Sequence, residues 1–341
     1  MKEGRRVGYS LKTGYLIGTL PAGCRYCLLG RKVVVFITGL CRDRCWYCPI
    51  SREKLGRDIV FVDENRVLNT YDIVDEVYKV SGLGASITGG DPILVIDRTC
   101  NVISLLKREF GERFHIHLYT SGRFVDEKVL ECLEASGLDE IRFHVYSYEL
   151  LDSVVKALDY GFDVGVEVPF IPLENYIGYL KKLILELDRI GVDFININEL
   201  EVSETNVDKI IMHGLEPTGL TVKGIHKKAI EFLKWAVENT SKINIHYCTI
   251  AFKDHVQYRF RMLNKALNLM GLHEIPTSEG TLLSIERVSG SVDSIDTYTV
   301  MDKIVFNPYR AYKYVGSGVK ASIVEYYPEK NRVLNRRTIV Y

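Results

Sequence analysis

The chain has 341 residues, and its 44 Lys and Arg balance its 44 Asp and Glu. This length suits one α/β barrel with an appendage, and the balance excludes a global basic field for nucleic acid, although not a local basic patch. No apolar run reaches the ~18 residues that cross a bilayer, and the charged start at residues 1–6 lacks a secretory apolar segment. We therefore expect a cytoplasmic protein without membrane contact.

The first cysteine pair, Cys24 and Cys27, lies just before the first predicted strand. A CxxC unit is half of a chelating site in both zinc and iron-sulfur proteins, so it needs partners. A strand predicted over 242–250 places His246 and Cys248 on one face. These residues could complete an auxiliary iron-sulfur cluster or a zinc site. The alternative is a reduced pair without a metal.

The next three cysteines, Cys41, Cys45 and Cys48, follow an apolar strand predicted over 33–40. Thiols at these spacings can hold three corners of a cubic iron-sulfur cluster, whose fourth iron then stays open for a substrate or cofactor unless a distant residue binds it. The alternative is a structural zinc knuckle, but zinc sites prefer paired CxxC units and four closed ligands. The remaining single cysteines, Cys100 and Cys132, are expected to be buried packing thiols.

The CxxxCxxC spacing, with Tyr47 just before the last cysteine, resembles the cluster loop of the radical S-adenosylmethionine (radical SAM) superfamily. The resemblance implies a [4Fe-4S] cluster that binds S-adenosylmethionine (SAM) on its open iron and cleaves it to a 5′-deoxyadenosyl radical, which abstracts hydrogen from a substrate. It also implies an electron donor of the flavodoxin or ferredoxin type, and a contact between Tyr47 and the adenine. The chain looks most similar to archaeal-type proteins related to pyruvate formate-lyase-activating enzyme. Activating enzymes proper are shorter, so glycyl-radical generation is not transferred from them.

Strands and helices alternate after the cluster loop. Strands are predicted over 33–40, a short segment entering 87–92, 114–119, 140–146, 163–169 and 193–199, and helices over 71–80, 102–110, 126–136, 148–160 and 176–190. Strands separated by helices predict a parallel sheet with right-handed crossovers. The fold class is therefore α/β, a (β/α)6 partial TIM-type barrel with a small β-rich C-terminal appendage.

This pattern predicts three parts of the chain. Residues 1–30 form an N-terminal segment with the CxxC unit, residues 31–250 the radical SAM partial barrel, and residues 251–341 a C-terminal helix and β-rich extension. The end of the extension is rich in Val, Ile, Tyr and Thr, which favour strands.

Polar residues alternate with apolar ones along four successive predicted strands. Because neighbouring residues in a strand face opposite sides, these polar residues share one face: His115, His117, Tyr119, Arg142, His144, Gly165, Glu167, Asn196 and Asn198. An ordinary closed barrel fills its centre with branched apolar side chains. The pattern predicts a wide, wet or ligand-filled lumen, and the alternative for each residue is a satisfied buried hydrogen bond.

The family resemblance implies SAM contacts at two turns. Gly89, Gly90 and Asp91 resemble the GGEP motif that contacts the methionyl amino group, with Asp91 where glutamate is usual. Glycines there allow the backbone to approach a ligand closely. Residues 120–122 resemble the TNG segment of glycyl-radical activating enzymes, which makes Ser121 a candidate.

Later strands supply the other cofactor candidates. Arg142 or His144 suits the SAM carboxylate, because a cation or an imidazole donor binds that group well. Asn198 or Glu199 is a candidate for the ribose or adenine. No catalytic residue is assigned.

The substrate is not identified from these residues. A small molecule or peptide is the first hypothesis. A radical SAM enzyme that modifies tRNA or other RNA is the second, and a non-enzymatic iron-sulfur or metal-binding protein is the third. Binding of RNA that weakens with salt would separate the second from the first.

Overall fold

The computed structural model describes residues 6–10, 14–300, 302–329 and 333–340. Its main sheet contains the parallel strands β3 (Lys32–Phe36), β6 (Gly84–Thr88), β7 (His115–Thr120), β8 (Glu140–Phe143), β9 (Asp163–Phe170), β10 (Phe194–Glu199) and β13 (Asn244–Cys248). Antiparallel strands extend both edges: β1 (Gly8–Ser10), β2 (Gly14–Ile17), β4 (Phe61–Val62) and β5 (Asn65–Arg66). The resulting order is β1-β2-β13-β10-β9-β8-β7-β6-β3-β4-β5.

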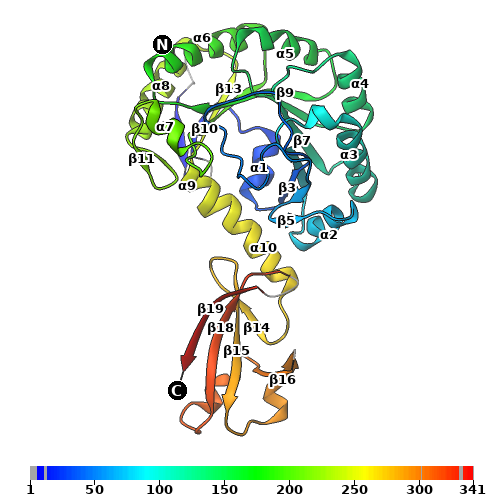
Figure 1. Ribbon diagram of the computed structural model, residues 1–341, viewed down its shortest axis with the longest axis vertical. Coiled ribbons are helices and arrows are strands. Elements are labelled where there is room, and N and C mark those ends of the chain that lie inside the picture. The colour runs from blue at the N-terminus through cyan, green and yellow to red at the C-terminus, as the bar shows by residue number, and fades with distance from the viewer. Residues whose placement is uncertain (1–5, 11–13, 301, 330–332, 341) are drawn as a thin grey trace.

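This sheet curls into the partial barrel of Figure 1, so the predicted fold class is confirmed. Strand β13 corresponds to the strand predicted over 242–250, which was not counted among the barrel strands. It pairs in parallel with β10. The barrel therefore has one more parallel strand than the predicted set.

Crossover helices cover the outside of the sheet (Figure 1). They are α2 (Tyr71–Lys79), α3 (Ile96–Phe110), α4 (Glu127–Ala135), α5 (Leu151–Ala157), α6 (Glu174–Ile190) and α8 (Ile225–Asn239). Their boundaries follow local chemistry: the Asp126 side chain accepts a hydrogen bond from the Val129 backbone N–H and begins α4, and Gly191 ends α6 with a φ of 88°. Short helices η1 (Pro92–Val95), η2 (Tyr148–Leu150) and α7 (Val207–Met212) and the hairpin of β11 (Pro217–Thr218) and β12 (Thr221–Val222) complete the connections.

The apolar core lies between the strands and these outer helices. Val33, Val35, Ile116, Leu118 and Ile141 point outward from their strands and are fully buried. Because side chains alternate, the polar residues between them face the lumen.

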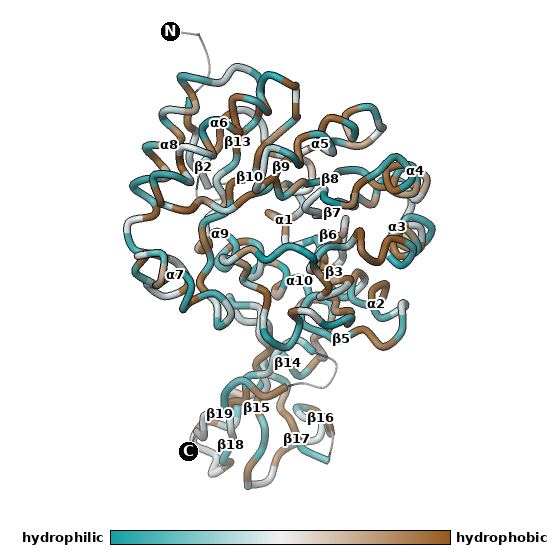
Figure 2. The backbone as a smooth tube through the Cα atoms, turned by 45° about the horizontal axis from the view of Figure 1, so that its top comes forward, coloured by the Kyte–Doolittle hydropathy of each residue, from teal (hydrophilic) through white to brown (hydrophobic). Residues whose placement is uncertain are grey.

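Helix α1 (Ala22–Leu28) lies inside the ring of strands in both Figure 1 and Figure 2. A Cβ at Gly23 would collide with His117, Arg142 and Glu140, so this glycine is what allows the helix to pack so closely. The prediction of a wide, wet or ligand-filled lumen is therefore wrong for the half that holds the amino ends of the strands. The polar faces there contact a helix instead.

The chain leaves the barrel through α9 (Ile250–Phe252), a π-helical segment (Lys253–Tyr258) and α10 (Arg259–Leu269). Beyond them lies the predicted β-rich appendage, an antiparallel sheet of β14 (Glu274–Pro276), β15 (Leu282–Ser289), β16 (Thr297–Val300), β17 (Lys303–Phe306), β18 (Lys320–Tyr326) and β19 (Leu334–Val340). The division of the chain at residues 30 and 250 stays a prediction. The charged start at residues 1–5 lies outside the described residues.

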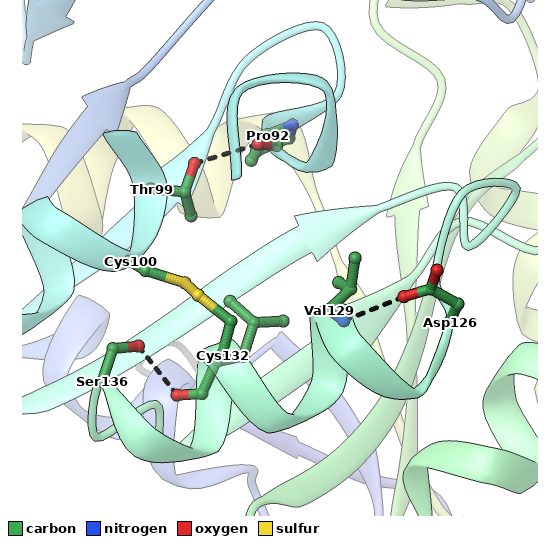
Figure 3. Close-up of a disulfide and its surroundings, with 8 residues drawn as sticks. Pro92, Thr99, Cys100, Asp126, Val129, Cys132 and Ser136 are labelled. Carbon is green, nitrogen blue, oxygen red and sulfur yellow. Dashed lines mark hydrogen bonds between the residues drawn. A yellow bond between two sulfur atoms is a disulfide. The ribbon is translucent and has the colours of Figure 1, made fainter. Parts of the chain in front are cut away.

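Cys100 of α3 and Cys132 of α4 form a disulfide, with their Cα atoms 6.4 Å apart (Figure 3). The expectation that they are separate packing thiols is wrong, because successive crossovers bring these two helices together on the outside of the barrel. In the part of the chain that the structure describes, no helix is long and apolar enough to cross a membrane.

Candidate functional site

The cluster loop follows β3 and lies at the carboxyl ends of the parallel strands, the face where α/β barrels place their sites. Backbone hydrogen bonds tie it to the turn after β6: the Gly90 N–H donates to the Thr38 carbonyl, and the Asp91 N–H to that of Leu40, each at 2.7 Å. A Cβ at Gly89 or Gly90 would collide with these same carbonyl oxygens. The two glycines thus permit close approach of the cluster loop itself.

Cys41, Cys45 and Cys48 are free and partly buried in this loop. Burial raises the pKa of Cys41 and raises that of Cys45 to about 11. Among the described residues, no group of three or more His, Cys, Asp or Glu side chains is arranged to hold a metal ion. The donor set still fits an iron-sulfur cluster, because three unpaired thiols stand within one short loop and a bound metal deprotonates them.

Tyr47 and His144 form a hydrogen-bonded pair beside the thiols. The Tyr47 hydroxyl lies 2.9 Å from His144 Nε2, which is also 3.9 Å from the sulfur of Cys45. His144 Nδ1 lies 3.0 Å from the Glu167 carbonyl oxygen. Because a carbonyl only accepts, Nδ1 carries the proton, and burial lowers the pKa of His144 and keeps the ring neutral. Nε2 therefore accepts the hydrogen bond that the Tyr47 hydroxyl donates, and it lies beside the Cys45 sulfur.

A loop after β10 braces the other side of the cluster loop. The Asn206 side chain donates to the Tyr47 carbonyl at 3.0 Å, and the Thr205 hydroxyl donates to the Cys48 carbonyl at 3.2 Å. The sequence analysis missed both residues, because they lie more than 150 positions from their partners and follow no local motif.

Asp91 is buried, and its carboxylate is occupied by protein donors. It accepts hydrogen bonds from the Thr120 hydroxyl at 2.8 Å, the Ser121 hydroxyl at 2.9 Å and the Ile93 N–H at 3.2 Å. The carboxylate thus caps η1 and joins the turns after β6 and β7. Its observed contacts are those of a positioning group.

Asp43, Arg123 and Tyr146 form a second link that the sequence analysis did not predict. The Asp43 carboxylate accepts hydrogen bonds from Arg123 Nε at 2.8 Å and from the Tyr146 hydroxyl at 2.5 Å. Although burial opposes it, hydrogen bonds from Tyr146, Ser121 and Arg123 lower the pKa of Asp43. Tyr146 continues the polar alternation beyond His144, which is the one signal in the sequence that pointed to it.

Arg142 lies one alternation below His144, in the lumen. It is 2% exposed and pairs with Glu140 and, at 2.8 Å, with Glu167. Asn198 donates to the other oxygen of Glu167 at 2.7 Å. Arg142 is therefore engaged by carboxylates of the protein, whereas His144 lies level with the cluster loop.

Glu199 projects from the opposite face of β10. Its carboxylate accepts hydrogen bonds from the Thr221 hydroxyl and the Ile250 N–H, both at 2.8 Å. These contacts hold the strand to the following loops.

The second thiol group lies around α1. Cys24 and Cys248 are buried and Cys27 is partly buried, and all three are free. Asn196 and Arg142 donate to the Cys24 sulfur at 3.2 and 3.5 Å. Burial alone would raise the pKa of Cys24, but Arg142 and a hydrogen bond with His246 outweigh it and lower that pKa.

The lower lumen also holds a compact set of titratable groups. Lys32 Nζ lies 3.1 Å from His115 Nδ1 and 2.6 Å from His117 Nδ1. Glu140, fully buried, accepts a hydrogen bond from the Gly23 N–H of α1 at 3.0 Å. These contacts are made by the polar faces that the sequence had suggested for a ligand, although the buried Nε2 of His115 has no hydrogen-bond partner among the described residues.

Comparison with protein families supports the interpretation of the cluster loop. Residues 35–150 match the model of the Radical SAM superfamily. A protein of Methanocaldococcus jannaschii, named as a candidate glycyl-radical enzyme activating enzyme, is 37% identical over 279 residues, covering 77% of this chain and 72% of that protein.

Solved structures show more distant similarity. SuiB of Streptococcus suis matches with a TM-score of 0.45 and 11% identity over 64% of this chain, which spans 49% of SuiB. Coproporphyrinogen III oxidase of Escherichia coli matches with a TM-score of 0.41 and 9% identity over 94% of this chain and 76% of that one. Neither match carries an argument about function.

The relative at 37% identity spans more than two thirds of both chains, and the family match begins in β3 and includes the cluster loop. The chain therefore belongs to the radical SAM superfamily and is related to its activating enzymes.

Proposed function

We propose that Cys41, Cys45 and Cys48 hold a [4Fe-4S] cluster and that SAM binds beside it, against Tyr47 and His144. When bound, the cluster and SAM supply reductive cleavage of the sulfonium to a 5′-deoxyadenosyl radical, which abstracts hydrogen from the substrate. The observation that carries the proposal is the set of three free thiols in a loop tied to the glycine turn after β6.

The surrounding residues position this loop. Asn206 holds the Tyr47 carbonyl, so the phenol stays within reach of His144. Asp43 joins the cluster loop to the segments after β7 and β8. Fixing several loops before the cofactor binds reduces the conformational entropy that binding must overcome.

His144 is the group we assign to the methionyl part of SAM. Its Nδ1 donates to the Glu167 carbonyl, so the ring has no donor left for the carboxylate that the sequence suggested. Its Nε2, which accepts from the Tyr47 hydroxyl, can accept from the ammonium group when that hydroxyl turns away. Gly89, Gly90 and Asp91 follow β6, Ser121 follows β7 and Asn198 lies in β10, and all five remain cofactor-binding proposals. Arg142 is a positioning residue in this proposal, because its ion pair holds Glu167 below His144.

The partners follow from this chemistry. Reductive cleavage needs a low-potential electron donor, and we propose one of the flavodoxin or ferredoxin type. The name of the M. jannaschii relative supports a polypeptide as the substrate.

The test is anaerobic reconstitution followed by measurement of 5′-deoxyadenosine released from SAM under reduction. We expect Cys45→Ala to lose the cluster absorbance and to release no 5′-deoxyadenosine. The matched control is Cys100→Ser with Cys132→Ser, which removes two thiols outside the site and should keep both the cluster and the cleavage. Release of 5′-deoxyadenosine by Cys45→Ala would contradict the proposal.

A further inference from the structure

We propose that three exposed arginines on and beside the cluster loop, Arg42, Arg44 and Arg57, form the docking face for an acidic electron-carrier protein. We call these three residues the arginine face. Their role rests on the proposed function, because a carrier is needed only where a cluster must be reduced. In that step one electron leaves the carrier, which is oxidised, and enters the cluster, which is reduced; no proton or group is transferred.

Positive charge is concentrated around the cluster loop. Residues 42–57 contain five Lys and Arg against two Asp and Glu, although the whole chain has 44 of each. All three residues of the arginine face are exposed. A local excess of exposed charge steers oppositely charged proteins into encounter and fixes their orientation. The balanced charge of the whole chain therefore conceals a basic surface beside the three free thiols.

Asp43 does not neutralise the arginines on either side of it. Its side chain is 4% exposed and pairs with Arg123 Nε at 2.8 Å. The carboxylate thus points into the protein and already has a cation, while Arg42 and Arg44 are exposed. Their charge is left for a partner in solvent.

The turn that carries Arg57 is fixed against the same loop. The Gly39 N–H donates to the Arg57 carbonyl at 2.8 Å, and the neighbouring Asp58 is paired with Arg98 at 2.6 Å. Gly39 precedes Arg42 by three residues, which span at most about 11 Å. The arginine face therefore fits within one protein interface of ordinary size. In the part of the chain that the structure describes, no carboxylate forms an ion pair with it.

The position of the arginine face favours an electron carrier over the substrate. Arg42 directly follows Cys41, and Arg44 directly precedes Cys45. A protein docked on these arginines lies beside the thiols that we assign to the cluster. The SAM site lies on the lumen side of the loop, where Tyr47 contacts His144. RNA is also attracted by exposed arginines, so its binding is one outcome that the experiment separates.

The first measurement is the affinity of an acidic flavodoxin for the anaerobically reconstituted full-length protein, by isothermal titration calorimetry at several salt concentrations. Binding by the wild type should weaken as salt rises. Arg42→Glu with Arg44→Glu should weaken it about 10- to 100-fold, whereas Arg42→Lys with Arg44→Lys keeps the charge and should retain most of it. Arg57→Glu lies outside the cysteine motif and should weaken binding without touching the ligand loop.

The matched control is Arg108→Glu with Arg113→Glu. Both arginines are exposed, at the end of α3 and just before β7, which is the opposite end of the strands from the cluster loop. This variant has the same change in net charge as the double variant of the arginine face. It should bind flavodoxin as the wild type does.

The second measurement is the rate of cluster reduction by reduced flavodoxin and by photoreduced 5-deazariboflavin, a small reductant without net charge. The variants of the arginine face that carry Glu should be reduced slowly by flavodoxin but at the wild-type rate by 5-deazariboflavin. That difference separates docking from damage to the cluster.

Several outcomes would overturn the docking face and leave the proposed function standing. They are a wild type that does not bind flavodoxin or binds it independently of salt, equal affinities in the wild type and the Glu variants, and slow reduction of Arg57→Glu by both reductants. Binding of tRNA that the Glu variants lose, with flavodoxin binding unchanged, would assign the arginines to nucleic acid instead. Failure of the wild type to cleave SAM after reduction by 5-deazariboflavin would contradict the proposed function itself.

Discussion

The two ends of the barrel lumen are built from the same alternating strands but hold different chemistry. At the carboxyl ends, partly buried thiols and a neutral His144 lie among loops joined by side-chain hydrogen bonds. At the amino ends, Arg142, Glu140 and Lys32 are almost fully buried against α1. The comparison teaches that polar alternation marks a lumen face, while the element packed against that face decides whether it binds a ligand or forms a charged core.

The largest expected effect is on the buried core. Arg142→Met should lower the free energy of unfolding by about 3 to 5 kcal/mol, because it leaves Glu140 and Glu167 without their cation in a buried site. Urea unfolding measures this. Arg142→Lys, which keeps the charge, should lose less, and an equal loss in both variants would show that the charge itself is unimportant.

The second effect is a pH dependence that arises at the same end. Burial, together with nearby cations, lowers the pKa of His115 to about 3 and that of His117 well below its ordinary value. Below about pH 6.5 the unfolded chain therefore binds more protons than the folded one. Each unit by which the pH falls then lowers the free energy of unfolding by up to about 2.7 kcal/mol for the two histidines together.

Urea titrations between pH 7 and about pH 5 measure that slope, because the stability that the two neutral histidines permit is fully present above about pH 6.5 and is lost as the pH falls. His115→Gln with His117→Gln should flatten it. The exposed His255 offers the matched control, because His255→Gln should leave the slope as it is. An unchanged slope in the double variant would contradict the assignment of neutral histidines to the core.

The third effect lies at the site end. Asp91→Ala should destabilise the protein by about 2 kcal/mol, because it removes the cap of η1 and the acceptor for two buried hydroxyls. It should also weaken retention of the cluster, as measured by the rate of iron loss to a chelator. Asp91→Asn keeps one acceptor oxygen, so its stability and its rate of iron loss should lie between those of Asp91→Ala and the wild type. Iron loss at the wild-type rate in Asp91→Ala would argue against a positioning role.

The smallest effect on stability concerns Arg123. Its side chain is 47% exposed, so Arg123→Ala should lower the free energy of unfolding less than any of the variants above, even though Asp43 loses an ion pair. Arg123→Lys serves as the control. If Arg123→Ala lowered the free energy of unfolding as much as Arg142→Met does, the proposed contrast between the two ends of the lumen would be wrong.

Local sequence was sufficient for the fold class and for the cluster loop. The alternation of strands and helices and the three thiols within eight positions, Cys41 to Cys48, depend on neighbours in the chain. Periodicity and spacing therefore carry them directly. The in-phase polar faces were also recognisable, because they need only the two-residue period of a strand.

Long-range packing decided the rest. Helix α1 enters the lumen because Gly23 fits against Glu140, a residue 117 positions away. The same kind of contact turns Asp91 inward and brings Cys100 to Cys132. Spacing alone does not encode such contacts, because their free energy depends on which groups the folded barrel brings together and hides from water. The sequence by itself thus determined that this protein carries a radical SAM cluster loop on a parallel barrel. Only the tertiary structure decided which of its polar residues face the site and which form the buried charged core around α1.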